Sequence, residues 1–96
     1  MSDDNYPSED ELLKVKEWPY TDTAGALAFV ASIWTYSEDA WRVDDMAHFA
    51  TGGWSGNEDL VHAMQENAML WALTWQSSER GGKHVFRVLP PMKEVQ

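Results

Sequence analysis

The chain has 96 residues and a formal net charge of −9, is 44% hydrophobic, and contains six tryptophans and no cysteine. It is therefore too apolar to be disordered and long enough for one domain, while its charge opposes direct binding to nucleic acid or to anionic membranes. The absence of cysteine excludes disulfides and thiolate metal sites, and no apolar run suits a transmembrane helix or secretory signal. We expect a cytoplasmic protein in which residues 8–90 form one domain between a flexible start, 1–7, and a tail, 91–96.

Two helices are predicted in the first third of the chain. Ser8 and Glu11 have the spacing of a capping box, in which each side chain satisfies a backbone N–H group at the start of a helix. A second helix is predicted over residues 23–36, with a cap at Asp22 or the next residue, because its apolar residues recur with helical spacing. The acidic segment 37–45 is predicted to be a loop.

Three strands and a third helix are predicted in the rest of the chain. Residues 46–51 alternate in the manner of a short strand, and residues 56–66 again have helical spacing. Residues 69–76 and 83–89 form two strand-like runs on either side of the loop 77–82. Two such runs around a loop that contains paired glycines indicate a β-hairpin.

These elements follow the order α-α-β-α-β-β and predict an α+β fold. A strand, a helix of about three turns and an immediate second strand form a βαβ unit, so the strands at 46–51 and 69–76 should be parallel. The hairpin then adds an antiparallel third strand. The sequence therefore predicts a three-stranded mixed sheet with about three helices, in which the turn 51–57 and the loop 77–82 lie at the same end.

The predicted turn contains the octapeptide Thr-Gly-Gly-Trp-Ser-Gly-Asn-Glu at residues 51–58. Within it, Ser55 and Glu58 form a second capping-box pattern, which makes Ser55 the predicted N-cap of the third helix. Glycines on both loops give the backbone access to positive φ angles. The residues with a predicted structural role are Gly52, Gly53, Glu58, Gly81 and Gly82.

This octapeptide, the pair Trp71 and Trp75, and a Gly-Gly pair followed by Phe86 resemble a family of small, uncharacterised bacterial and phage proteins. The resemblance covers about residues 27–88. In those relatives an aromatic residue often follows Gly-Gly-His, whereas this chain has Gly-Gly-Lys-His at 81–84. The resemblance implies a mobile-element or host-conflict setting, and it implies no reaction, ligand or catalytic residue.

The glycine-rich turn has several chemical interpretations besides a structural one. The Gly-x-Ser-x-Asn stretch at 53–57 approaches a nucleophile elbow, but it lacks the final glycine and the chain is too short for that fold. The Gly-x-x-Gly stretch at 53–56 resembles the loop with which KH domains clamp nucleic acid, but no basic cluster accompanies it. Backbone N–H groups at the helix start could also bind an anion. The candidate residues for this small-ligand or anion site are Trp54, Ser55, Asn57 and Arg80.

The histidines give no reason to predict a metal site. His48, His62 and His84 lie on three different predicted elements, without the short spacings of a zinc-binding helix. Each is more simply a surface or hydrogen-bonded residue. No metal, cofactor or catalytic residue is therefore predicted.

The acidic residues are concentrated in the first half of the chain. Residues 1–45 contain eleven acids and three bases, whereas residues 46–96 contain five acids and four bases. Such a field steers a protein toward basic partners, as in anti-defence inhibitors and immunity proteins, although it could equally serve only to keep the domain soluble. We predict a non-enzymatic protein that inhibits or regulates a basic partner, with a small-ligand module as the alternative. The candidate partner-binding residues are Glu38, Asp39, Trp41, Asp44 and Asp45.

The tryptophans bear on oligomeric state. Trp54, Trp71 and Trp75 either pack inside the domain or form an exposed aromatic face. Large aromatic side chains are frequent anchors of protein interfaces, so an exposed face would favour docking or a homodimer.

Overall fold

The computed structural model describes residues 6–34, 40–52, 55–80 and 82–90. Within these ranges the chain forms four α-helices, a short 3₁₀ turn and one four-stranded sheet. The predicted α+β class is confirmed, whereas the predicted three strands and about three helices differ from the structure in number. The elements are α1 (Glu9–Lys16), η1 (Tyr20–Asp22), α2 (Thr23–Ser32), β1 (Ala40–Val43), β2 (Met46–Ala50), α3 (Ser55–Glu66), α4 (Ala68–Thr74), β3 (Trp75–Glu79) and β4 (Lys83–Arg87).

The sheet is antiparallel and has the strand order β1-β2-β4-β3. Strands β2 and β3 both pair antiparallel with β4, so they point in the same direction but are not neighbours. The predicted mixed sheet is therefore wrong, because β4 lies between the two strands that the βαβ unit was expected to join. The two loops still meet at one end of the sheet, since Ala50 at the end of β2 pairs with Lys83 at the start of β4.

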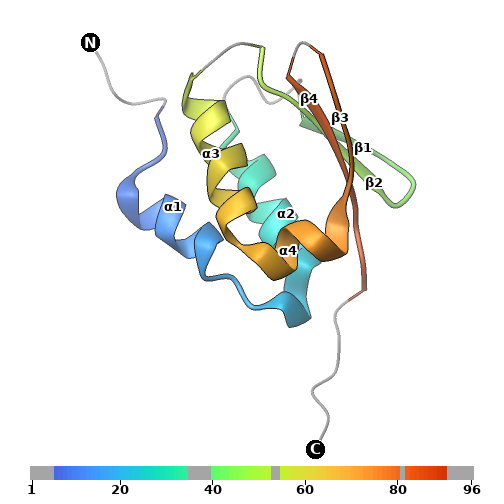
Figure 1. The fold of residues 1–96 in the computed structure, drawn as a ribbon, viewed down its shortest axis with the longest axis horizontal. Helices are drawn as coiled ribbons and strands as arrows, with labels where there is room; N and C mark the ends of the chain where they lie inside the picture. The colour runs from blue at the N-terminus through green and yellow to red at the C-terminus, as the bar shows by residue number, and fades with distance from the viewer. Residues whose placement is uncertain (1–5, 35–39, 53–54, 81, 91–96) are drawn as a thin grey trace, which may run out of the picture.

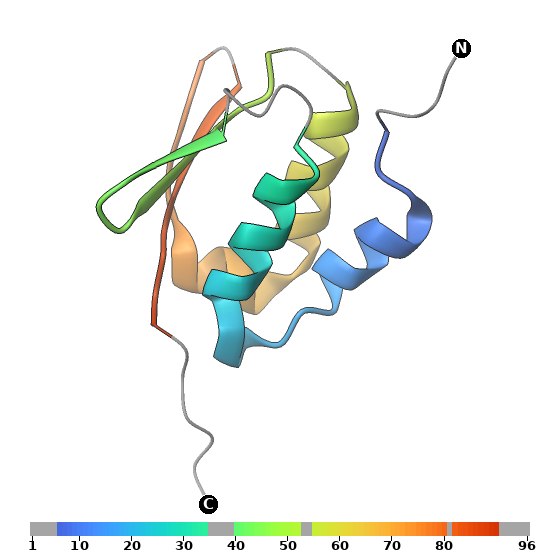
Figure 2. The same ribbon diagram turned by 180° about the vertical axis from the view of Figure 1, so that it is seen from behind.

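The helices cover one face of the sheet and leave the other open. Helices α2, α3 and α4 lie against the sheet, and α1 packs outside them against α3 (Figures 1 and 2). The core lies between these layers, where the rings of Phe49 and Phe86 are 5.7 Å apart and both side chains are buried. From the helices the largest fully buried apolar side chains are Leu60, Met64, Leu70, Val15 and Val30.

The predicted starts of the first two helices are confirmed. Ser8 Oγ accepts a hydrogen bond from the Glu11 N–H at 3.0 Å, and the Ser8 N–H donates to Glu11 Oε1 at 2.8 Å, which completes the capping box. Asp22 Oδ1 accepts from the Gly25 N–H at 3.1 Å and caps α2. Helix α2 ends at Ser32, earlier than predicted, and the next residues, 35–39, lie outside the described part of the chain.

Strand β1 lies within a segment that was predicted to be a loop, so that prediction is wrong for residues 40–43. Val43 pairs with Met46, which leaves Asp44 and Asp45 as a two-residue hairpin turn. Asp44 has φ 54°, in the left-handed region that aspartate tolerates better than most residues. Two of the four acids for which segment 37–45 was predicted to be a loop, Asp44 and Asp45, are therefore the turn between two strands.

Helix α4 replaces most of the strand predicted over residues 69–76. Its sequence is rich in alanine, leucine and methionine, which are strong helix formers. Asn67 Oδ1 accepts from the Leu70 N–H at 3.2 Å and caps the helix, and the buried residues Leu70 and Thr74 are four apart. The alternation of Trp71, Leu73 and Trp75 resembled a strand, but only the last of these residues is in β3.

Candidate functional site

The two glycine-containing loops meet as the sequence predicted. The Thr51 N–H donates to the Gly82 carbonyl at 3.0 Å, which extends the pairing of β2 and β4 to the end of the sheet. Gly52 and Gly82 both have positive φ angles, 60° and 85°. The conformational role predicted for these two glycines is therefore present. Gly53, Trp54 and Gly81 lie outside the described residues.

The predicted anion-binding residues do not converge on one point. Ser55 was predicted to be the N-cap, just before the helix, but it is the first residue of α3. The Ser55 Oγ is hydrogen-bonded to the Tyr6 hydroxyl at 2.9 Å. Asn57 is 1% exposed, so its amide faces the protein interior. Arg80 is exposed at the end of β3. Among the described residues, no hydrogen bond or ion pair joins Arg80 to α3.

A polar hollow lies beside this junction. It has a volume of about 210 Å³ and combines the meeting point of the loops with one side of α3. Glu58, His62 and Gln65 are spaced by four and three residues, so they share that side of the helix. The lining residues are Thr51, Glu58, Val61, His62, Gln65, Gly82 and His84. The helical spacing was visible in the sequence, but the contribution of His84 depends on the register of β4.

His84 belongs to a short chain of hydrogen bonds on β3 and β4. Its Nδ1 is 2.8 Å from Ser78 Oγ, and Ser78 Oγ also accepts from the Trp75 indole N–H at 2.8 Å. Partial burial lowers the pKa of His84 below its usual value of 6.5, and the nearby Glu58 carboxylate opposes that shift. Burial therefore favours the neutral form of the imidazole.

We expect His84 to make the fold less stable under mildly acidic conditions. Because its pKa is lower in the folded protein, the unfolded chain binds the proton more readily, so stability is complete above pH 6.5 and falls as the pH drops through the folded pKa. A ¹H–¹³C NMR titration should give a midpoint below 6.5, and Glu58→Gln should lower it further. A midpoint above 6.5 in the wild-type protein would contradict this assignment.

The electrostatics of the hollow do not favour an anion. A carboxylate, Glu58, lines it, and the neutral His84 supplies no compensating positive charge. Within the described ranges no three His, Asp or Glu side chains gather closely enough to hold a metal ion. This arrangement gives little support to the anion site that was considered from the sequence.

The predicted partner-binding residues lie on the β1–β2 hairpin, as far as they are described. Asp45 forms an ion pair with Arg87 at 3.4 Å, so its charge is partly compensated. Trp41 is 41% exposed on the open side of the sheet, where it stacks on His48 with ring centroids 5.0 Å apart. Lys83 Nζ lies 5.6 Å from the Trp41 ring. Glu38 and Asp39 fall outside the described residues.

Charge is separated between the two layers of the domain. The helical segments 6–34 and 55–74 contain eight acids and two bases, for a net charge of −6. The sheet segments 40–52 and 75–90 contain three acids and four bases, for a net charge of +1. Among the described residues most of the acidic charge thus belongs to the helical segments, while the candidates Asp44 and Asp45 are exposed on the β1–β2 hairpin.

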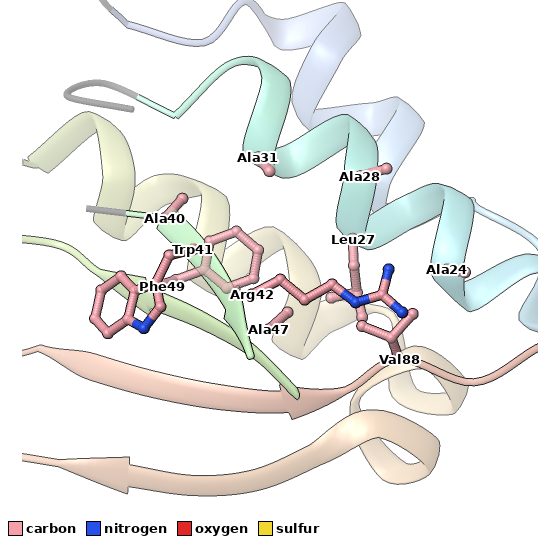
Figure 3. Close-up of a pocket in the computed structure, with 10 residues that line it drawn as sticks. All are labelled: Ala24, Leu27, Ala28, Ala31, Ala40, Trp41, Arg42, Ala47, Phe49 and Val88. Atoms are coloured by element: carbon pink, nitrogen blue, oxygen red, sulfur yellow. The ribbon is translucent and has the colours of Figure 1, made fainter. Parts of the chain in front are cut away.

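A second hollow lies between α2 and the edge of the sheet (Figure 3). It has a volume of about 220 Å³, and most of its lining is apolar. Alanines from α2, β1 and β2 leave space where larger residues would fill the core, and Arg42 crosses from β1 toward α2. Its lining residues are Ala24, Leu27, Ala28, Ala31, Ala40, Trp41, Arg42, Ala47, Phe49 and Val88.

Comparisons with protein-family models, curated proteins and solved structures find no significant match to this chain. None of the helices in the described ranges is long and apolar enough to cross a membrane.

Proposed function

We propose that this protein is a non-enzymatic binding protein that inhibits or regulates a basic protein partner by covering its positively charged surface. The observation that supports this function is the charge separation between the acidic helical layer and the nearly neutral sheet. A nucleic-acid-binding protein has a basic surface of the kind that would complement this layer.

The two lysines of the helical layer are already engaged within the domain. Lys16 Nζ forms an ion pair with Glu66 at 3.6 Å. Lys14 Nζ lies over the rings of Trp18 and Phe29, at 5.5 and 4.7 Å from their centroids. The net charge of −6 already includes both ammonium groups, so the surplus of carboxylates remains.

Several carboxylates on this layer are exposed to solvent. Glu9 and Asp10 occupy the first turn of α1, and Asp59 lies in the first turns of α3. Helices α1 and α3 pack against each other, so these groups belong to one layer. Exposed charges of one sign accelerate association with an oppositely charged partner and make it sensitive to salt.

The alternative function, a small-ligand module at the joined loops, receives less support. Asn57 is buried, and the adjoining hollow is lined by a carboxylate that repels anions. The Glu58 carboxylate that opposes an anion adds to the negative field that attracts a basic protein. The acidic binding protein is therefore the function that the geometry supports best.

A charge-neutralised variant tests the proposal. Replacing Glu9, Asp10 and Asp59 by Gln, Asn and Asn should weaken binding to the partner by about tenfold, because each exposed charge contributes up to roughly 1 kcal/mol to such an interface. The partner is first captured with the wild-type chain, and the purified pair is then measured by calorimetry at low and high salt.

The matched control changes net charge by the same amount on the other layer. Asp44→Asn, Asp45→Asn and Glu79→Gln also remove three negative charges, but from the sheet. This variant should bind within about threefold of wild type, since only the location of the lost charges differs. Equal losses in the two variants, or salt-insensitive binding by the wild-type protein, would contradict the proposal.

A further inference from the structure

We infer that the apolar hollow between α2 and β1 is a binding site for a small carboxylic acid with an apolar body. This inference is independent of the proposed partner binding, because it concerns a different surface. It depends on three observations: the size of the hollow, its lining, and the position of Arg42.

The hollow is large enough for a small organic molecule. Its volume is about 220 Å³, whereas an engineered apolar cavity of roughly 150 Å³ takes up benzene. A ring or short chain of six to eight carbon atoms therefore fits this space. A drug-sized ligand does not, because such ligands occupy pockets of about 300 Å³ or more.

The lining selects an apolar body. Leu27 is 2% exposed and Phe49 is 2% exposed, so both are fixed parts of the core. Alanines on both sides contribute methyl groups and no hydrogen-bonding side-chain atom. A polar body placed here would lose its hydrogen bonds with water without replacement, which is unfavourable.

Arg42 selects a carboxylate. Its Nε–H donates to the Asp44 carbonyl at 2.8 Å, which holds the side chain along the hollow. In the described part of the chain Arg42 forms no ion pair, and its two terminal nitrogens form no hydrogen bond. A guanidinium offers parallel N–H groups that match the two oxygens of a carboxylate. Asp44 and Asp45 are the acids nearest to Arg42 in the chain, and Asp45 is already paired with Arg87.

Benzoate is the probe that tests this inference, with benzyl alcohol as its neutral analogue. In ¹H–¹⁵N and methyl NMR spectra of the full chain, benzoate should shift signals of Leu27, Ala31 and Val88 with a millimolar dissociation constant. Arg42→Gln should weaken benzoate binding by about fivefold, because losing an exposed charge-assisted contact changes a dissociation constant by up to about tenfold. The same substitution should leave the affinity for benzyl alcohol unchanged. Arg80→Gln is the matched control, because Arg80 is exposed and outside the hollow.

A second pair of variants tests the location. Ala28→Leu narrows the hollow and should abolish the shifts, whereas Ala72→Leu makes the same chemical change on an exposed residue of α4 and should have no effect. The inference is overturned if benzoate causes no localised shifts up to about 10 mM, a range that covers affinities typical of such small ligands. The inference would also be overturned if benzyl alcohol bound as tightly as benzoate. Nuclear Overhauser contacts from residues 91–96 to Leu27 would overturn it too, because they would mean that the chain itself fills the hollow.

Discussion

Replacing Asn67 with alanine should lower the free energy of unfolding by about 3 to 4 kcal/mol, because this side chain caps α4 and links the junction of α3 and α4 to the end of α1. Its Nδ2 donates to the carbonyls of Val15 and Trp18, both at 3.0 Å, and these residues lie at the end of α1 and just beyond it. Its Oδ1 accepts from the Leu70 N–H and caps α4. Removing the amide would therefore take a side-chain donor from two carbonyls, although the Val15 carbonyl still accepts from the Trp18 N–H at 3.3 Å, and it would leave α4 without its cap.

The consequence should be visible in thermal unfolding followed by circular dichroism. A loss of this size lowers the melting temperature by roughly 15 °C in a domain of about 100 residues. Asn67→Ser keeps an oxygen that can cap α4 but cannot reach α1, so it should lose about half as much. Gln65→Ala removes an exposed amide two residues away and should change stability by less than about 0.5 kcal/mol. Equal stability of Asn67→Ala and Gln65→Ala would contradict this role.

The role of Asn67 shows why the helix ends were easier to predict than the strand order. Caps act between residues three or four apart, so Ser8 with Glu11 and Asp22 with Gly25 could be recognised in the sequence and are present in the structure. Asn67 could also be recognised as a helix boundary. Its bonds to Val15 and Trp18 could not, because they join residues about 50 positions apart.

The errors in the sheet have a similar cause. Chain length and direction correctly placed the loops after β2 and β3 at one end, and this follows from local geometry. The position of β4 between those strands, and the pairing of β1 with β2, depend on which strands form hydrogen bonds with each other. Residues 68–74 are almost all apolar, a pattern that suits a short buried strand as well as a helix, whereas the cap at Asn67 and the burial of Leu70 belong to the helix that forms.

The candidate sites depend still more on tertiary structure. The acidity of the chain was evident from composition, but its concentration on α1 and α3 follows from how the layers pack. The hollow beside Arg42 exists because α2 and β1 both present alanines to it, and β1 was not predicted. Those alanines have no helical or strand-like signal that would distinguish a hollow from a tightly packed core.

Replacing Gly82 with alanine should lower the free energy of unfolding by about 3 kcal/mol, through two separable effects. Its φ of 85° is unfavourable for any residue with a Cβ atom. A Cβ built at this position would also overlap Thr51 Oγ1. The overlap lies at the junction of the two loops, where the Thr51 N–H donates to the Gly82 carbonyl, so the pairing of β2 and β4 cannot adjust freely.

A double-mutant cycle separates these effects. Thr51→Ala removes the hydroxyl that a new Cβ would meet, so in that background Gly82→Ala should cost only the backbone part, about 1 to 2 kcal/mol. Gly52→Ala serves as a comparison, because Gly52 also has a positive φ, of 60°. Denaturant unfolding of the four proteins of the cycle gives the coupling energy directly. Strict additivity would show that Gly82 is required only for its backbone angle and that the close approach of the two loops contributes nothing to stability.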